Sequence, residues 1–247
     1  LVSVSFLPIL LTVSPAPAFS TTKPMTLAQL YRISPLGCVG SFLLGGVFAG
    51  LFGMSSVYGT EKGLNVAQIS AFVAAIYVGG LVLQLPIGIA SDRMDRRVLI
   101  TGLTAFGAVI AGFALVVPVS FIMIMILGLL IGGVANPLYS LLIAYTNDHI
   151  DNDDMAAASG GLIFINGLGA MIGPLAIGWL MGRFGADAFF GYIAVLMALI
   201  AVYAVYRMSQ RPGPASDETM PYTPVLPQAS PVAVEVAQEV AIEKAAE

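Results

Sequence analysis

Six separated runs of apolar residues dominate the sequence, and they constrain its fold more than any other feature. A helix rises about 1.5 Å per residue and the hydrocarbon of a bilayer is about 30 Å thick, so about 20 residues suffice for one crossing. The runs cover residues 36–58, 67–90, 97–117, 119–145, 155–182 and 187–207. None shows the alternation that a transmembrane barrel strand requires. We therefore predict an all-α, polytopic membrane protein with six transmembrane helices.

The composition agrees with a membrane protein and excludes an ordinary soluble domain. Charged residues make up only 10% of the chain, whereas a soluble domain carries about 25%. A single cysteine, Cys38, and a single histidine, His149, leave little for disulfide or metal chemistry, so we expect no cofactor and no metal. Basic and acidic side chains balance over residues 1–208, so we expect no nucleic-acid partner.

The segments outside the six runs complete the organisation of the chain. Residues 1–13 are apolar but too short to cross a bilayer, and we interpret them as the end of a preceding transmembrane helix. A secretory signal peptide is the alternative, although its usual basic region is missing. Residues 14–35 form a cytoplasmic interdomain linker with a short amphipathic helix at 26–33, ahead of a transmembrane half-domain at 36–208. Residues 209–247, rich in proline and acid, form a disordered cytoplasmic tail.

Basic residues near the ends of the runs predict the orientation. If the linker is cytoplasmic, seven basic residues lie on the cytoplasmic side and two lie outside. The inner set is Lys23, Arg32, Arg93, Arg96, Arg97, Arg207 and Arg211, and the outer set is Lys62 and Arg183. The positive-inside rule then predicts a multi-pass protein of the inner (plasma) membrane, with both ends of the six-helix unit in the cytoplasm.

The loop between the second and third runs carries a motif. It reads Gly88-Ile89-Ala90-Ser91-Asp92-Arg93-Met94-Asp95-Arg96-Arg97. This resembles the cytoplasmic-loop signature of the major facilitator superfamily, which is a glycine, three residues, Asp-Arg, a spacer, a glycine and two basic residues, with Asp95 here in place of the second glycine. Gly88 permits a close helix crossing, and Asp92 can bind a helix N-terminus or pair with Arg96 or Arg97. With Arg93, these residues form a candidate conformational latch; the alternative is that the arginines only anchor the loop at the lipid headgroups.

The fifth run carries a second match to the same family. The segment Gly169-Ala170-Met171-Ile172-Gly173-Pro174-Leu175-Ala176-Ile177-Gly178 resembles the glycine-proline signature of the family's fifth and eleventh helices, with Ile177 in place of one glycine. Gly169, Gly173 and Gly178 suit close packing, and Pro174 removes a backbone donor and kinks the helix, as in a hinge. In detail, residues 1–210 are most similar to the YcaD-type bacterial branch of the superfamily.

The resemblance implies the second half of a twelve-helix transporter, a 3+3 inverted repeat completed by a missing N-terminal six-helix half. It implies transport of a small organic solute by alternating access, with the first and fourth helices of each half lining a cavity. No carboxylate lies in the interior of any run, so a neutral or amphipathic solute is expected. A stand-alone six-helix subunit that dimerises stays open. A membrane-embedded enzyme is less favoured, because such enzymes need acids, histidine or metal ligands at depth.

Polar residues at membrane depth are the candidates for contact with the solute. In the fourth run, Asn136, Tyr139 and Ser140 share one helical face and are the first choice. The alternative for Asn136 is that it satisfies the backbone freed by Pro137.

Two further runs contribute candidates. Tyr77 and Gln84 lie two turns apart in the second run, and Asn166 lies on the glycine face of the fifth. Hydrogen bonding between helices is the alternative for Gln84, and close packing is the alternative for Asn166. The acidic residues before the fifth run suit the start of a helix, and we interpret them as caps rather than metal ligands. They are Asp148, Asp151, Asp153 and Asp154.

Overall fold

The computed structural model describes residues 25–117, 120–150, 154–210 and Val240. Six helices in these ranges are long and apolar enough to cross a membrane, which confirms the predicted fold class. Their bounds are Pro35–Glu61, Val66–Ser91, Arg96–Val116, Phe121–Asn147, Met155–Phe184 and Ala188–Gln210, each within three residues of the predicted run. The predictions for residues 1–13 and for nearly all of the tail fall outside the described residues.

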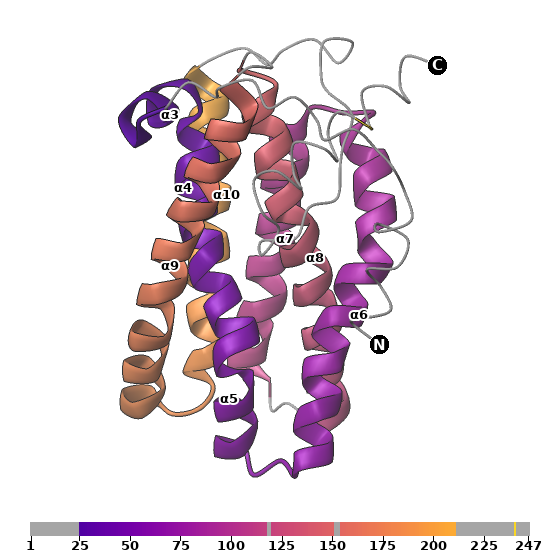
Figure 1. Ribbon diagram of the computed structural model, residues 1–247. Coiled ribbons are helices and arrows are strands. Elements are labelled where there is room, and N and C mark those ends of the chain that lie inside the picture. The colour runs from indigo at the N-terminus through magenta and orange to yellow at the C-terminus, as the bar shows by residue number, and fades with distance from the viewer. Residues whose placement is uncertain (1–24, 118–119, 151–153, 211–239, 241–247) are drawn as a thin grey trace, which may run out of the picture.

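The first span combines three elements: α4 (Pro35–Phe48), a π-helix η1 (Ala49–Met54) and α5 (Ser55–Glu61). The other spans are α6 (Val66–Ser91), α7 (Arg96–Val116), α8 (Phe121–Asn147), α9 (Met155–Phe184) and α10 (Ala188–Gln210). A short helix, α3 (Leu27–Ile33), occupies the place where the sequence predicts one. The spans stand side by side as an up-and-down bundle (Figure 1). We call its two ends the α3 end, which also holds the turn between α6 and α7, and the α5 end.

Polar caps determine where several helices begin. Asn65 Oδ1 accepts a hydrogen bond from the Gln68 backbone at 2.9 Å, and Gln68 Oε1 accepts one from the Asn65 backbone at 3.0 Å, which makes a capping box at the start of α6. Thr26 and Gln29 form the same arrangement at the start of α3. Such caps satisfy backbone donors that the first helical turn leaves free.

Two pairs of helices cross with backbone against backbone. Between α6 and α8, a Cβ atom on Gly79 would collide with the Leu129 carbonyl. Between α4 and α9, a Cβ atom on Gly45 would collide with the Asn166 carbonyl, and one on Gly169 with the Phe42 carbonyl. Only glycine permits so close an approach, which accounts for the glycines at these two crossings.

The helix pairs follow the pattern of an inverted repeat. In such a repeat, α4 corresponds to α8, α6 to α9 and α7 to α10. Under this exchange, the contact of α4 with α9 becomes that of α8 with α6, and the contact of α7 with α10 is unchanged. The contact of α7 with α8 likewise becomes that of α10 with α4. The arrangement therefore matches the predicted 3+3 repeat.

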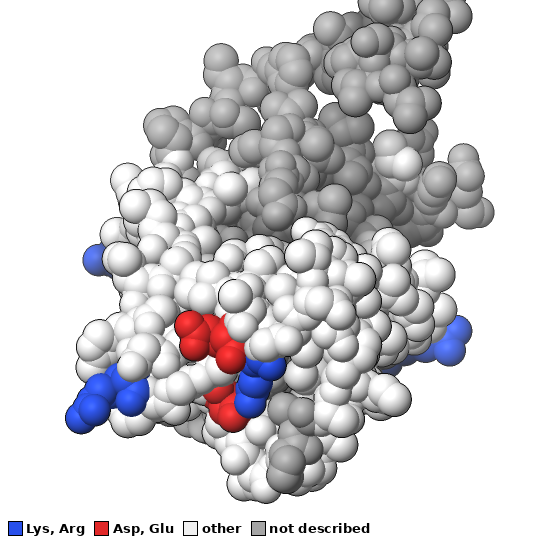
Figure 2. Space-filling view, turned by 90° about the horizontal axis from the view of Figure 1, so that it is seen from below, with Lys and Arg blue, Asp and Glu red and all other residues white. Residues whose placement is uncertain are grey.

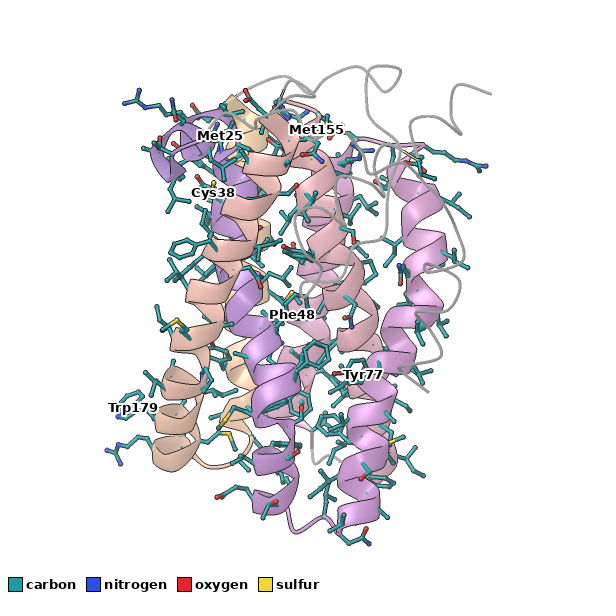
Figure 3. The ribbon with its side chains drawn as sticks, in the orientation of Figure 1. Met25, Cys38, Phe48, Tyr77, Met155 and Trp179 are labelled. Atoms are coloured by element: carbon teal, nitrogen blue, oxygen red, sulfur yellow. The ribbon has the colours of Figure 1, made fainter. Side chains whose placement is uncertain are left out.

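Aromatic side chains mark the two ends of the apolar belt. Trp179 and Phe184 are exposed on α9 near the α5 end, and Trp179 projects outward from the bundle (Figure 3). Tyr31 and Tyr206 are exposed near the α3 end. Tryptophan and tyrosine favour the two membrane interfaces, so Trp179 at one end and the two tyrosines at the other lie where the borders of a lipid-facing belt are expected.

Candidate functional site

Four aromatic side chains from three spans meet at mid-height in the bundle. They are Phe48 at the end of α4, Phe52 in η1, Tyr77 on α6 and Tyr139 on α8, and we call them the aromatic cluster. The ring centroid of Phe48 lies 5.7 Å from that of Phe52 and 6.4 Å from that of Tyr139, and the ring centroids of Phe52 and Tyr77 are 4.9 Å apart. Phe48 and Tyr77 are visible between α4 and α6 in Figure 3.

The aromatic cluster leads from the core to the surface. Tyr139 is fully buried, Phe48 is 6% exposed and Tyr77 is 54% exposed. The Tyr139 hydroxyl is buried and has no hydrogen-bond partner among the described residues. A buried hydroxyl without a partner is costly. Because Tyr139 has no exposed surface, the helices around it would have to open before a bound molecule could supply that partner.

Both central spans are irregular near this cluster. The spans Pro35–Glu61 and Phe121–Asn147 are each 27 residues long, and η1 and Pro137 lie at corresponding positions along them. π-Helical segments are rare in proteins, and those that occur are often found at functional sites. Pro137 cannot donate a backbone hydrogen bond within α8. Each of the two helices therefore has a local irregularity in its hydrogen bonding beside the same group of rings.

The polar candidates of α8 have different surroundings. Asn136 packs against Gly80 of α6, and its Nδ2 donates to the Gly132 carbonyl at 2.9 Å. Because Pro137 has no backbone N–H, the Gly133 carbonyl lacks its helical donor. Asn136 donates instead to the carbonyl of the preceding residue, Gly132. Ser140 is buried at 2% exposure. Of the three residues on the predicted face, the structure brings only Tyr139 into the aromatic cluster.

The remaining candidates lie on α6 and α9. Gln84 is half-buried, two turns beyond Tyr77 on α6. Asn166 of α9 is 7% exposed, and its Nδ2 donates to the Ser41 carbonyl of α4 at 3.0 Å. Asn166 thus lies at the glycine crossing of α4 and α9, where it contributes to packing.

The glycine-proline motif of α9 lies along the same crossing. Gly169 and Gly173 are buried against α4 and η1, whereas a Cβ atom on Gly178 would meet only Met54, at 3.9 Å. Pro174 is exposed, and α9 continues through it to Phe184. The motif therefore combines a close crossing with one missing backbone hydrogen bond at the exposed Pro174.

The motif in the turn between α6 and α7 is centred on Arg96, which is 2% exposed. Arg96 Nε donates to Ser91 Oγ at 3.2 Å, and Nη1 donates to the Ala144 carbonyl at 3.3 Å and pairs with Asp148. Its Nη2 lies 3.8 Å from an Asp92 oxygen. A single guanidinium thus ties the end of α6 and the start of α7 to the end of α8.

Asp95, the residue that replaces the family's glycine, caps α7. Its Oδ1 accepts from the Arg97 backbone at 2.8 Å, and its Oδ2 lies 2.7 Å from Arg97 Nη2. These hydrogen bonds from Arg97 lower the pKa of the Asp95 carboxyl below its ordinary value. In the same turn Gly88 is buried and Arg93 is exposed.

The interpretation of the acids before α9 as caps is wrong for Asp148. This residue ends α8 as its C-cap, and its side chain is 1% exposed and paired with Arg96. Asp154 stands at the N-cap of α9 but makes no capping hydrogen bond through its side chain. Asp151 and Asp153 lie outside the described residues.

The α5 end also carries an ion pair. Lys62 Nζ lies 2.6 Å from Asp187 Oδ1 and joins the turn after α5 to the turn before α10. Seen from this end, the molecule is largely uncharged, with acidic and basic side chains against each other near the middle (Figure 2). An ion pair therefore links the two three-helix repeats at each end of the bundle.

The bundle has six apolar spans in a 3+3 arrangement, and Arg96 binds the turn between α6 and α7 to the end of α8. This architecture is consistent with half of a transporter. The sequence model of the Major Facilitator Superfamily matches residues 37–236, and the chain belongs to this superfamily. It is 24% identical over 190 residues to an uncharacterised MFS-type transporter of Enterobacter sp. (strain 638), and 23% identical to YcaD, an uncharacterised MFS-type transporter of Escherichia coli. Each match covers 75% of this chain and 47% of the relative, so the chain spans about half the length of these relatives.

These comparisons confirm the predicted family and its YcaD-type branch. The family supports a role in transport across a membrane. Sequence reasoning had selected Tyr77 and Tyr139 of the aromatic cluster and missed Phe48 and Phe52. The Phe-Ala-Gly-Leu-Phe segment of the first span, with two rings four residues apart, was the available signal.

Proposed function

We propose that this chain is one half of a secondary transporter that moves a small organic solute by alternating access. A second six-helix half completes the solute cavity, and the bound solute lies near the bilayer midplane. The proposal rests on the family membership and on the 3+3 packing of six apolar spans.

The observation that carries the proposal is the aromatic cluster. Its rings come from α4, η1, α6 and α8, and Tyr77 presents one of them at the surface. Aromatic faces suit apolar and aromatic groups, while the Tyr139 hydroxyl and the Gln84 amide supply a few hydrogen bonds. Since the interiors of the runs contain no carboxylate, a neutral or amphipathic organic solute fits this half of the cavity best.

The test is transport by the full-length protein in proteoliposomes against a panel of neutral aromatic, neutral aliphatic and charged compounds, with and without a proton gradient. For a transported aromatic compound, we expect Tyr77→Ala to reduce uptake about tenfold, equivalent to about 1.4 kcal/mol, and Tyr77→Phe to retain most of it. Phe106→Ala on α7 removes a ring of similar exposure away from the aromatic cluster and serves as the control. Unchanged uptake by Tyr77→Ala would overturn the assignment of this site.

The orientation is part of the same proposal. Lys62 follows α5 and Arg93 lies in the turn between α6 and α7, so the proposal puts them on opposite faces of the membrane. Because most basic residues lie at the α3 end, this end faces the cytoplasm. Labelling of Arg93→Cys and Lys62→Cys variants from each side is expected to reach position 62 from outside and position 93 from inside. Labelling of both positions from one side would contradict this topology.

A further inference from the structure

A group of three tyrosines and one arginine lies at the α3 end, away from the aromatic cluster. It comprises Tyr31 of α3 and Tyr203, Tyr206 and Arg207 of α10, and we call it the Tyr-Arg patch. The rings of Tyr203 and Tyr206 have centroids 6.2 Å apart. Tyr203 interacts electrostatically with both Tyr31 and Arg207, so the patch joins α3 to the last turns of α10.

Arg207 has an unmet hydrogen-bonding demand. Its Nε atom is buried and, within the described part of the chain, has no hydrogen-bond partner. A guanidinium carries five donors in a planar fork that suits two oxygens of a phosphate or carboxylate. Leaving a buried donor unpaired costs free energy. Arg207 as a whole is only half-buried, so a small movement of its side chain would let the guanidinium meet an acceptor at the surface.

The position of the patch limits which acceptor is available. Arg207 lies in the last turn of the final apolar span, and the exposed Tyr31 and Tyr206 rings mark the depth of a membrane interface. The abundant acceptors at this depth are the phosphate oxygens of lipid headgroups. Hydroxyl groups of Tyr31 and Tyr206 add donors beside the guanidinium.

The surface below the patch fits the rest of a lipid. Exposed side chains repeat along α10 at positions i, i+4, i+7 and i+11 and form one apolar stripe that ends at the patch. The stripe consists of Val195, Leu199, Val202 and Tyr206. A molecule with a phosphate head on Arg207 and an acyl chain on this stripe would match both surfaces.

We propose that the Tyr-Arg patch is a binding site for an anionic phospholipid. Arg207 holds the headgroup phosphate, Tyr31 and Tyr206 donate hydrogen bonds to it, and the apolar stripe of α10 receives an acyl chain. Because Tyr31 belongs to α3, the bound lipid also stabilises the contact of α3 with the bundle. This site differs from general attraction of basic residues to a membrane, since it depends on the tyrosine hydroxyls and on one particular arginine.

The experiment measures lipid retention by the purified full-length protein in mixed micelles, with native mass spectrometry as the readout. Phosphatidylglycerol and phosphatidylcholine are supplied in equal amounts, and glycerol 3-phosphate is added in a separate arm. We expect preferential retention of phosphatidylglycerol, an apparent affinity about tenfold lower in Arg207→Gln, and no competition by glycerol 3-phosphate. The Tyr31→Phe/Tyr206→Phe variant keeps every charge, and we expect its apparent affinity for phosphatidylglycerol to be several-fold lower than that of the unmodified protein.

The control variant is Arg93→Gln, which removes one exposed arginine from the same end of the bundle. It is expected to retain phosphatidylglycerol as the unmodified protein does. Equal losses in Arg207→Gln and Arg93→Gln would overturn the proposal, as would equal retention of the two lipids. Displacement by glycerol 3-phosphate would also overturn it, because the patch would then bind a soluble phosphate. If Arg207→Gln does not fold, the doubly substituted tyrosine variant decides: unchanged selectivity in it contradicts the site.

Discussion

The Arg96 guanidinium pairs with the Asp148 carboxylate across 52 positions of sequence, and each side chain is at most 2% exposed. Asp148 stands at the C-terminal end of α8, where the helix dipole is negative and an acidic side chain alone is unfavourable. Arg96 compensates this charge and also binds the Ala144 carbonyl. Separation of the turn between α6 and α7 from α8 would therefore leave buried charges without compensation.

Asp148→Asn is expected to lower the free energy of unfolding by about 3 kcal/mol, since removing one member of a buried ion pair leaves the other uncompensated. Chemical denaturation of the full-length protein in detergent measures the change. Asp92→Asn is the control, because the Asp92 side chain is 45% exposed and lies 3.8 Å from Arg96. We expect a loss below about 1 kcal/mol for the control; equal losses in the two variants would contradict a dominant Arg96–Asp148 pair.

Asp95 predicts a dependence of stability on pH. Hydrogen bonds from Arg97 lower the pKa of its carboxyl below 3.8, so folding favours the ionised form. The resulting stabilisation is present above pH 3.8 and is lost as the pH falls through the lower pKa of the folded state. Asparagine is also a good N-cap, so Asp95→Asn removes mainly the ion pair and is expected to cost about 1 kcal/mol at neutral pH.

Stability of the Asp95→Asn variant and of the unmodified protein is compared from neutral to acidic pH by thermal unfolding. The difference between them is expected to shrink as the pH falls below 3.8. A difference that stays constant over this range would show that Asp95 acts through its cap alone.

The crossing of α4 and α9 predicts opposite effects for two glycines of the same helix. A Cβ atom on Gly169 would strike the Phe42 carbonyl, so Gly169→Ala is expected to destabilise by about 3 kcal/mol. Gly167 has open space around it, and Gly167→Ala is expected to be neutral or to stabilise by up to about 1 kcal/mol through helix propensity. Denaturation of both variants tests the prediction, which fails if Gly169→Ala is as stable as Gly167→Ala.

The ion pair at the α5 end is expected to contribute much less than the pair at the α3 end. The Lys62 and Asp187 side chains are 27% and 48% exposed, so water screens their attraction. Asp187→Asn should change the free energy of unfolding by less than about 1 kcal/mol, and added salt should reduce the effect further. A loss as large as that of Asp148→Asn would show that this pair is a principal connection between the two turns.

The spans and their family could be predicted because length and apolarity alone determine where a helix can cross a bilayer. Asn65 and Asp95 are N-caps of α6 and α7, and residues of these types indicate where a helix begins. The two motifs could be assigned because their glycines and charges stand at fixed spacing along one element. Such features depend on neighbours in the chain and therefore leave a signal in the sequence.

Contacts between distant segments left no such signal. Asp148 adjoins other acids in the sequence and resembles a helix cap, yet its partner Arg96 comes from another turn of the bundle. For Phe48 and Phe52 the sequence shows only their spacing of four residues, and packing is what places them beside Tyr77 and Tyr139. The π-helix η1, which begins after Phe48 and contains Phe52, likewise has no distinct signal in its six residues.

At the two glycine crossings, main-chain atoms of one helix rest directly on main-chain atoms of another. Side chains can change rotamer to absorb a small displacement, but peptide groups in direct contact have no such freedom. A sliding movement of α4 along α9, or of α6 along α8, would thus require the helices first to separate. We therefore expect α4 with α9, and α6 with α8, to move as rigid pairs. In the transport cycle proposed above, the path for the solute would then open between such units or at the contact with the second half.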